Sequence, residues 1–167
     1  MTGSQSPIRN PQASTAVSHR AGGDRLPFAR GSRLLKHADF QKVYEQGRRQ
    51  FSANMTFFYL LQPDQPPFTA EVGFTVGRVM GPAVVRNRIR RRMRDAVRHH
   101  LPALDRELGS RQLSAEVVIN PKKGALKAEM EKLRGEVAKG FQAIAAGTPG
   151  AADPADNQRP HKKRSSR

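Results

Sequence analysis

Residues 86–98 of this chain carry seven arginines and a single aspartate. Apolar residues in and beside this stretch recur every three or four positions, so they share one face of an α-helix; they are Val85, Ile89, Met93, Ala96 and Val97. Most charge runs are solvated helix faces, but arginines this dense repel one another unless an anion neutralises them, and guanidinium groups pair well with phosphate oxygens. The stretch predicts a helix that packs on a sheet by its apolar stripe and presents its other faces to nucleic acid.

The overall charge favours the same kind of partner. The 167 residues include 30 Lys and Arg against 14 Asp and Glu, for a formal net charge of +16, and such an excess is typical of proteins that bind polyanions. No apolar run approaches the roughly 20 residues that a membrane-spanning helix needs. The chain has no cysteine, which excludes disulfides and thiolate metal sites. We expect a cytoplasmic protein with no membrane partner.

The chain divides into three parts by composition. Residues 1–30 and 147–167 are rich in small, polar, proline and basic residues without periodicity, and we expect both to be disordered because they cannot bury enough apolar surface to offset chain entropy. These tails are either solvated linkers or sites of additional phosphate contact. Residues 31–146 have the size of one domain with one core.

Hydrophobic periodicity within that domain predicts six elements. A helix over 38–46 ends at Gly47 in a left-handed cap. The strand over 68–77 pairs with the strand over 55–62 as an antiparallel hairpin. The arginine helix opens at Gly81-Pro82 and ends near Pro102 or a little beyond. The other elements are strands over 55–62, 68–77 and 115–120 and an amphipathic helix over 125–146, whose buried stripe is Leu126, Met130, Leu133, Val137, Phe141 and Ile144. The order α-β-β-α-β-α predicts a compact α+β sandwich of helices on a small sheet.

The residues offer a binding surface and no protein active site that we can identify. Carboxylates are dispersed along the core region, whereas phosphodiester hydrolysis by a protein usually needs them clustered around metal. His99 and His100 are adjacent, so they point to different sides of a helix. There is no glycine-rich phosphate-binding loop. We expect no metal site and no catalytic residue in the protein.

The aromatic residues of the first strand leave two arrangements open. Phe57, Tyr59 and Leu61 share one face of the strand, and Phe58 and Leu60 share the other. Helices could bury both faces. Alternatively, one face could form part of a groove in which aromatic rings stack unpaired bases, with Phe40 and Tyr44 of the first helix as its wall.

Several segments together resemble the bacterial ribonuclease P protein subunit. They are Gly-Phe-Thr-Val at 73–76, Gly-Pro-Ala-Val-Val-Arg-Asn-Arg-Ile-Arg-Arg at 81–91, Met-Arg at 93–94, Arg-Leu-Leu-Lys at 33–36, and Asp-Phe-Gln-Lys-Val-Tyr at 39–44 followed by Gly47. The resemblance covers residues 33–141. The chain departs from the family pattern at Pro82, where Asn is common, at Val79, which replaces one of a usual basic pair, and at Arg92, where an apolar residue is common. Tyr44 stands where Phe is common.

The resemblance implies a function. In this family the RNA subunit performs the endonucleolytic hydrolysis with Mg²⁺, and the protein binds that RNA and the single-stranded 5′ leader of precursor tRNA. The family fold has the element order predicted above, often with a short extra strand. The resemblance implies no protein partner. A structural RNA-binding protein, such as a small ribosomal protein, is the alternative, because it would share the charge and the fold class.

The resemblance also implies site residues. Phe40, Tyr44, Phe57 and Tyr59 would line the leader cleft. Arg33, Lys36 and Arg78 would add basic contacts. The surface of the basic helix that contacts RNA would consist of Arg86, Asn87, Arg88, Arg90, Arg91 and Arg94.

Overall fold

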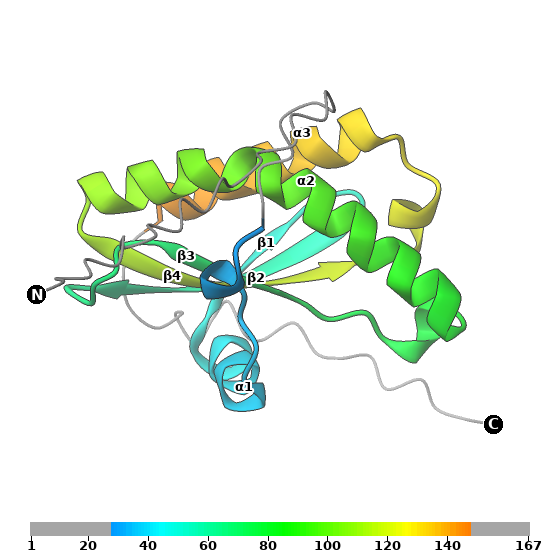
Figure 1. The fold of residues 1–167 in the computed structure, drawn as a ribbon, viewed down its shortest axis with the longest axis horizontal. Coiled ribbons are helices and arrows are strands. Elements are labelled where there is room, and N and C mark those ends of the chain that lie inside the picture. Colours follow the sequence, from blue (N-terminus) through cyan, green and yellow to red (C-terminus); the bar gives the residue numbers. More distant parts are fainter. Residues whose placement is uncertain (1–27, 148–167) are drawn as a thin grey trace, which may run out of the picture.

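The chain forms a four-stranded sheet between two helical layers (Figure 1). The computed structural model describes residues 28–147, so most of the two predicted tails lies outside the described residues. The helices are α1 (His37–Gln46), α2 (Ala83–Ser110) and α3 (Met130–Ala145). The strands are β1 (Arg48–Phe51), β2 (Met55–Pro63), β3 (Ala70–Phe74) and β4 (Leu113–Pro121). Short 3-10 turns lie at Arg30–Ser32, Arg78–Met80 and Lys123–Leu126.

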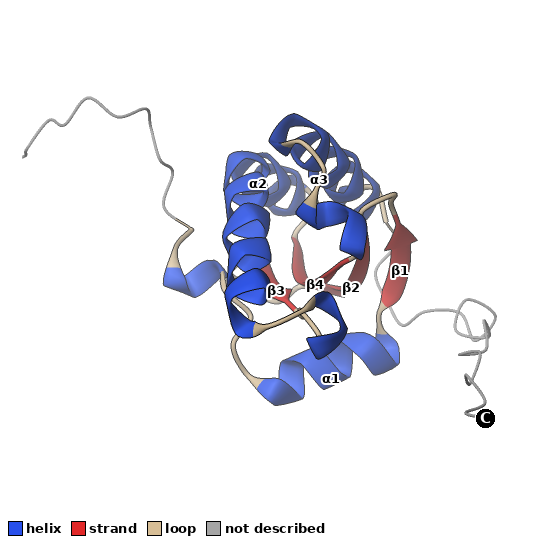
Figure 2. Cartoon of the chain, turned by 90° about the vertical axis from the view of Figure 1, so that its right-hand side faces the viewer, coloured by secondary structure: helices blue, strands red, loops and turns tan. Residues whose placement is uncertain are grey.

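The helices cover the two faces of the sheet unequally. Helices α2 and α3 pack against each other and on one face, α2 over β3 and β4 and α3 over β1 and β2, while α1 alone packs on the other face (Figure 2). A single helix of ten residues cannot cover four strands. Part of the α1 face of the sheet therefore remains accessible.

The strand pairing differs from the predicted hairpin. The strand order is β1-β2-β4-β3, so β2 and β3 are not neighbours. Strand β4 lies between them, antiparallel to β2 and parallel to β3. The hairpin prediction was wrong because it assumed that strands close in sequence pair directly. The β3-α2-β4 crossover instead inserts the longest strands at the centre. The edge strand β1, which the residues had not indicated, pairs with β2.

The two faces of β2 pack into two separate cores. Phe57, Tyr59 and Leu61 lie in the large core beneath α2 and α3. Leu60 lies in a small core with Leu34, Val43 and Val118, against which Phe40, Tyr44 and Phe58 pack with part of their surface exposed. Helices therefore cover both faces of β2, as in the first arrangement, but α1 closes the smaller core only in part, so the groove of the second arrangement stays open as a prediction.

Three helix ends differ from the predicted ones. Helix α2 continues through Pro102 to Ser110. Helix α3 begins at Met130, after a separate turn that holds Leu126; Leu126 and Met130 are only partly buried, whereas the other predicted stripe residues are buried. Gly47 is extended, with φ −80° and ψ 160°, and is not a left-handed cap. A glycine is needed there for space, because a Cβ atom would lie 2.3 Å from the carbonyl oxygen of Val43.

Candidate RNA-binding site

The exposed side of α2 forms a basic ridge. The apolar stripe of α2 is buried on the sheet as predicted, so the opposite side of the helix faces solvent. Asn87, Arg88, Arg91 and Arg94 are exposed, and Arg86 and Arg90 are half-buried. Arg90 donates a hydrogen bond from Nη1 to Oδ1 of Asn87 at 3.0 Å, which orients the amide beside the guanidinium group. These six residues, which we call the basic ridge, are the ones expected from the sequence, and the helix brings them together.

The other two arginines of the stretch serve the fold. Arg92 donates to the carbonyl oxygens of Ala125, Leu126 and Ala128, so it fixes the turn that precedes α3. Arg98 pairs with Asp95 of the same helix.

Asp95 also joins α2 to α3. Nη2 of Arg134 lies 2.8 Å from its Oδ2. Burial alone would raise the pKa of Asp95, but the hydrogen bond from Arg134 and the charge of Arg98 outweigh it and hold the pKa below its ordinary value. The single acid in the arginine stretch is therefore already neutralised within the protein and leaves the ridge uniformly positive.

A short turn sets where the ridge begins. Gly81 has φ 125°, in the region that favours glycine, and Pro82 follows as the residue before the first helical one. Arg78 in this turn is exposed. Val79 and Val84 are exposed large apolar side chains, 75% and 79% accessible. The start of the ridge therefore carries both charge and apolar surface.

An aromatic cleft lies between α1 and the sheet. Phe40 and Tyr44 occupy successive turns of α1 and are half-buried. The Tyr44 hydroxyl donates to Oδ1 of Asn120 at 2.8 Å and also contacts the Thr75 hydroxyl at 2.8 Å, which fixes the ring over the ends of β3 and β4. A hollow of about 450 Å³ opens beside it. It is lined by His37, Phe40, Gln41, Tyr44, Glu45 and Thr75.

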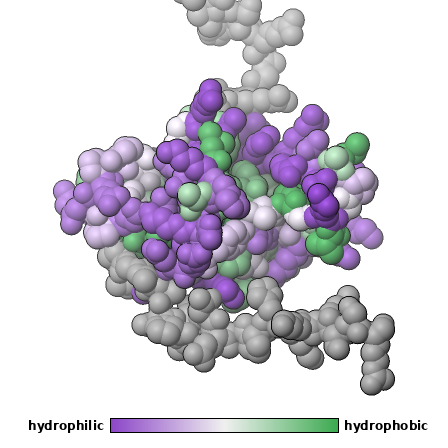
Figure 3. Space-filling model, turned by 90° about the horizontal axis from the view of Figure 1, so that it is seen from below, coloured by the Kyte–Doolittle hydropathy of each residue, from purple (hydrophilic) through white to green (hydrophobic). Residues whose placement is uncertain are grey.

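Phe58 of β2 packs against Tyr44 beside this hollow. Its ring meets Tyr44 edge-on, with centroids 4.8 Å apart, and the Arg49 guanidinium lies 5.3 Å from its centroid. Because paired residues point to the same side of a sheet, the register places Arg49 and Phe51 of β1 on this face beside Phe58 and Thr56. We call Phe40, Tyr44 and Phe58 the aromatic cleft. The surface on the α1 side is mainly hydrophilic with small apolar patches (Figure 3).

The structure does not bring Phe57 and Tyr59 into this cleft. Phe57 has no exposed surface and packs against Phe141 of α3, and Tyr59 is 8% exposed in the same core. Their assignment to the cleft is corrected, because they point to the opposite face of β2. Strand alternation separates Phe57 and Tyr59 from Phe58, but it does not say which face lies beneath which helix, so Phe58 was missed.

Gly73 positions the ring of Phe40. A Cβ atom at this position of β3 would lie 2.4 Å from Cζ of Phe40. The absence of a side chain therefore allows the ring to lie directly on the strand.

The remaining predicted basic residues lie apart from the ridge. Arg33 is exposed, donates to the carbonyl oxygen of Phe28 at 2.9 Å and lies over the ring of Phe28. Lys36 is exposed immediately before α1. Both stand near the β3 edge of the sheet, because Arg33 forms a bridge with Val72.

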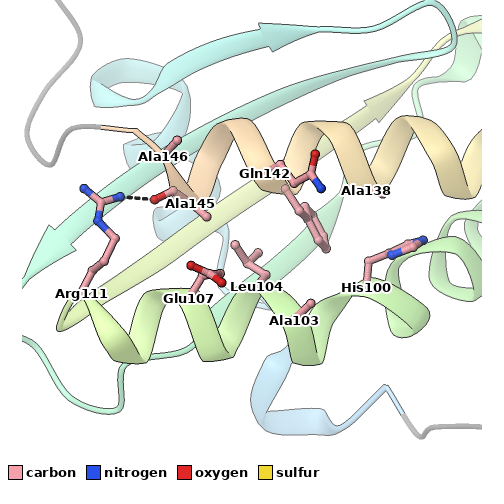
Figure 4. Close-up of a pocket in the computed structure, with 10 residues that line it drawn as sticks. His100, Ala103, Leu104, Glu107, Arg111, Ala138, Gln142, Ala145 and Ala146 are labelled. Carbon is pink, nitrogen blue, oxygen red and sulfur yellow. Dashed lines mark hydrogen bonds between the residues drawn. The ribbon is translucent and has the colours of Figure 1, made fainter.

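A second hollow lies between α2 and α3 near their packed interface (Figure 4). It has a volume of about 430 Å³, and its lining includes His100, Glu107 and Arg111. Burial and the charge of His99 lower the pKa of His100. Arg111 donates to the carbonyl oxygens of Ala145 and Gly147 and so caps the end of α3.

The described residues contain neither a candidate metal site nor a membrane-spanning helix. Among residues 28–147, no three His, Asp or Glu side chains are grouped so that they could hold a metal ion. Within the same range, no helix combines the length and apolar character needed to cross a membrane.

The fold and the two surfaces define a small α+β protein that joins a basic helix to an aromatic cleft. The chain belongs to the ribonuclease P protein family, because the family model described as Ribonuclease P matches residues 28–145.

Curated relatives agree with this assignment. The chain is 48% identical over 69 residues to the ribonuclease P protein component of Gluconacetobacter diazotrophicus, a match that covers 41% of this chain and 58% of that protein. It is 35% identical over 99 residues to that of Maridesulfovibrio salexigens, covering 59% and 73%. It is 33% identical over 114 residues to the ribonuclease P protein component of Citrifermentans bemidjiense, a match that covers 68% of this chain and 89% of that protein. The first of these matches thus spans less than two thirds of the relative.

Solved structures show the same fold. The RNase P protein from Thermotoga maritima superposes with a TM-score of 0.54 at 17% identity, covering 67% of this chain and 96% of that one. A Staphylococcus aureus RNase P protein mutant with defective mRNA degradation activity gives 0.53 at 21% identity, covering 70% and 89%. The fold of this chain therefore matches that of solved RNase P proteins.

Proposed function

We propose that this chain is the protein subunit of a ribonuclease P, which binds a catalytic RNA and the 5′ leader of precursor tRNA in the cytoplasm. The observation that carries the proposal is the direct connection between the two surfaces. Thr75, which contacts Tyr44 in the aromatic cleft, is followed by residues 76–82, and these lead into the basic ridge. One short segment therefore joins a surface for unpaired bases to a surface for phosphates.

The basic ridge suits the folded RNA. Its guanidinium groups stay charged at physiological pH and fork onto phosphate oxygens. Asn87, held by Arg90, adds a directional hydrogen bond within this charged surface. Contacts of this kind orient the protein on an RNA backbone without reading its sequence.

The aromatic cleft suits the leader. A leader is single-stranded, so its bases are free to stack on aromatic rings, and such stacking contributes about 1–3 kcal/mol per base. Tyr44 is locked by Asn120 and Thr75, so its ring loses little freedom when a base binds. A mature tRNA has no leader and would not use this surface, which gives the protein a means of preferring the precursor.

We assign the hydrolysis to the RNA. The carboxylates of the described residues are dispersed or engaged, as Asp95 is with two arginines. The protein offers no grouping for Mg²⁺ within residues 28–147, so the ion would be held by the RNA. The role of the protein is then to neutralise phosphates and to hold the leader.

Reconstitution tests the proposal. The RNA that copurifies with the protein is identified, and each component alone and both together are incubated with precursor tRNA over a range of Mg²⁺ concentrations. We expect a catalytic RNA, no cleavage by RNA-free protein, and cleavage at the mature 5′ end at lower Mg²⁺ when the protein is present. Copurification of ribosomal RNA would instead support a ribosomal protein, and correct cleavage by RNA-free protein would contradict the assignment of catalysis.

A further inference from the structure

An exposed aromatic residue stands at the free edge of the sheet. Phe51 is the last residue of β1 and is 58% accessible. Strand β1 pairs only with β2 within the described sheet, and Figure 2 shows it at the edge between the level of α1 and that of α3. An exposed sheet edge with a large apolar side chain offers a surface on which another molecule can bind.

Phe51 also lines a groove between β1 and α3, which we call the edge groove. The groove has a volume of about 530 Å³. Gln50 and Phe51 form its strand side, and Lys132 and Lys139 of α3 contribute exposed ammonium groups to its helix side. Between the lysines lies Gly135, where a Cβ atom would meet nothing within 4 Å. No side chain fills the groove at Gly135, and an aromatic ring and two positive charges surround this space.

The one carboxylate of the edge groove is already engaged. Glu136 accepts hydrogen bonds from the Ser52 hydroxyl, from the backbone N–H of Asn54 at 2.9 Å and from the Asn54 side chain. Burial alone would raise the pKa of Glu136, but these hydrogen bonds, together with the charge of Lys132, hold it below its ordinary value. The carboxylate ties the β1–β2 turn to α3, so it shapes the groove and leaves Lys139 to face solvent.

The edge groove meets the face of the aromatic cleft at the free edge of β1, where Phe51 lies. On β1, Arg49 and Phe51 point to the same side, and Arg49 lies over the ring of Phe58. A strand of RNA that leaves Phe58 across β1 meets Phe51 next, and it reaches the two lysines only by passing around the free edge of β1, because α3 packs on the opposite face of the sheet. The basic ridge follows β3, which is the edge strand opposite β1. The edge groove is therefore the part of this path that lies furthest from the ridge.

We propose that the edge groove binds leader nucleotides upstream of those in the aromatic cleft, with a base stacked on Phe51 and phosphates bound by Lys132 and Lys139. This inference rests on the proposed function, which supplies a single-stranded RNA in the cleft. The charge of the groove, and the row of Phe58, Arg49 and Phe51 that leads to it from the cleft, favour RNA over a protein segment. The protein then senses leader length as well as leader presence.

The experiment measures the affinity of the reconstituted holoenzyme for precursor tRNAs whose leaders are lengthened one nucleotide at a time. We expect the wild type to gain affinity in a further step once the leader passes Phe58. Phe51→Ala should remove that later step, a loss of at least about fivefold for long leaders, and leave short leaders unchanged. Phe51→Tyr should retain it, because the ring is kept.

Two further variants test the charges and the position. Lys132→Gln/Lys139→Gln should reduce the salt dependence of binding for long leaders only. Leu35→Ala removes another exposed apolar side chain, 61% accessible, near the opposite edge of the sheet, and should change neither class of leader. Melting curves of all variants should coincide with that of the wild type, since the substituted side chains are exposed.

The outcomes separate the two proposals. If the wild type prefers precursor to mature tRNA but Phe51→Ala shows the wild-type length profile, the edge groove does not bind leader and only this inference fails. If Phe51→Ala weakens short and long leaders equally, its effect is structural and the inference also fails. If the wild type shows no preference for the precursor, the proposed function and this inference fail together.

Discussion

Arg92 should stabilise the protein, whereas its neighbour Arg91 should bind RNA. The Arg92 guanidinium donates to three carbonyl oxygens, with Nη1 at 2.8 Å from Ala125 and 2.6 Å from Leu126. A hydrogen bond to a charged group contributes about 1.5–3 kcal/mol. Water reaches this half-buried site, so we expect Arg92→Met to cost about 2–3 kcal/mol in total rather than the sum of three full bonds.

Thermal unfolding measures this cost. For a domain of this size, 1 kcal/mol corresponds to about 4 °C in Tm, so Arg92→Met should unfold roughly 8–12 °C below the wild type. Arg91→Met is the matched control, because it removes the same groups from an exposed position; its Tm should stay near that of the wild type while its RNA affinity falls. Equal Tm values for the two variants, or a larger loss of RNA affinity for Arg92→Met at a temperature where both are folded, would refute the reasoning.

Three further predictions concern the cleft, the core and the carboxylate of the edge groove. Phe58→Ala should weaken precursor binding by about 1–3 kcal/mol and leave mature tRNA unaffected in a binding assay, whereas Phe57→Ala should lower the free energy of unfolding by about 3–5 kcal/mol; equal effects of both on stability would contradict the assignment of the two faces. Gly73→Ala should displace the ring of Phe40, reduce stability by about 1–3 kcal/mol and weaken leader binding, and an unchanged affinity would show that the ring position does not matter. Glu136→Gln should be less stable than the wild type at neutral pH. The hydrogen bonds that lower the folded pKa of Glu136 stabilise the protein only while the carboxylate is charged, so the difference in unfolding free energy should shrink as the pH falls below the ordinary value of 4.5. A difference that grows in acid would contradict the lowered pKa.

Much of the fold was predictable because periodicity is strong in this chain. The buried stripe of α2 and the strands β2 and β4 follow directly from it. The insertion of β4 between β2 and β3 was not predictable from periodicity, because both pairings bury the same residues. Strand β1 has the sequence Arg-Arg-Gln-Phe, which carries no apolar alternation, so its edge position depends on backbone pairing with β2 alone.

The site was predictable to different degrees on its two surfaces. The members of the basic ridge follow from helical spacing, and the exposed positions agree with it. Which arginines serve the fold instead depends on the turn at residues 123–128, whose approach to Arg92 is a tertiary contact. The cleft required knowledge of which face of β2 lies beneath α1, and this choice separated Phe58 from Phe57 and Tyr59.

The most direct test of the central claim is the salt dependence of RNA binding by an Arg88→Gln/Arg91→Gln variant. Both residues are exposed on the basic ridge, and glutamine retains helix propensity, so folding should be preserved. If each arginine neutralises one phosphate, the slope of log affinity against log salt should become shallower by about 1.4 to 1.8. Arg106→Gln, exposed on the same helix beyond the ridge, should leave the slope unchanged. A double variant with the wild-type slope would mean that the ridge is a solvated face and would contradict the account.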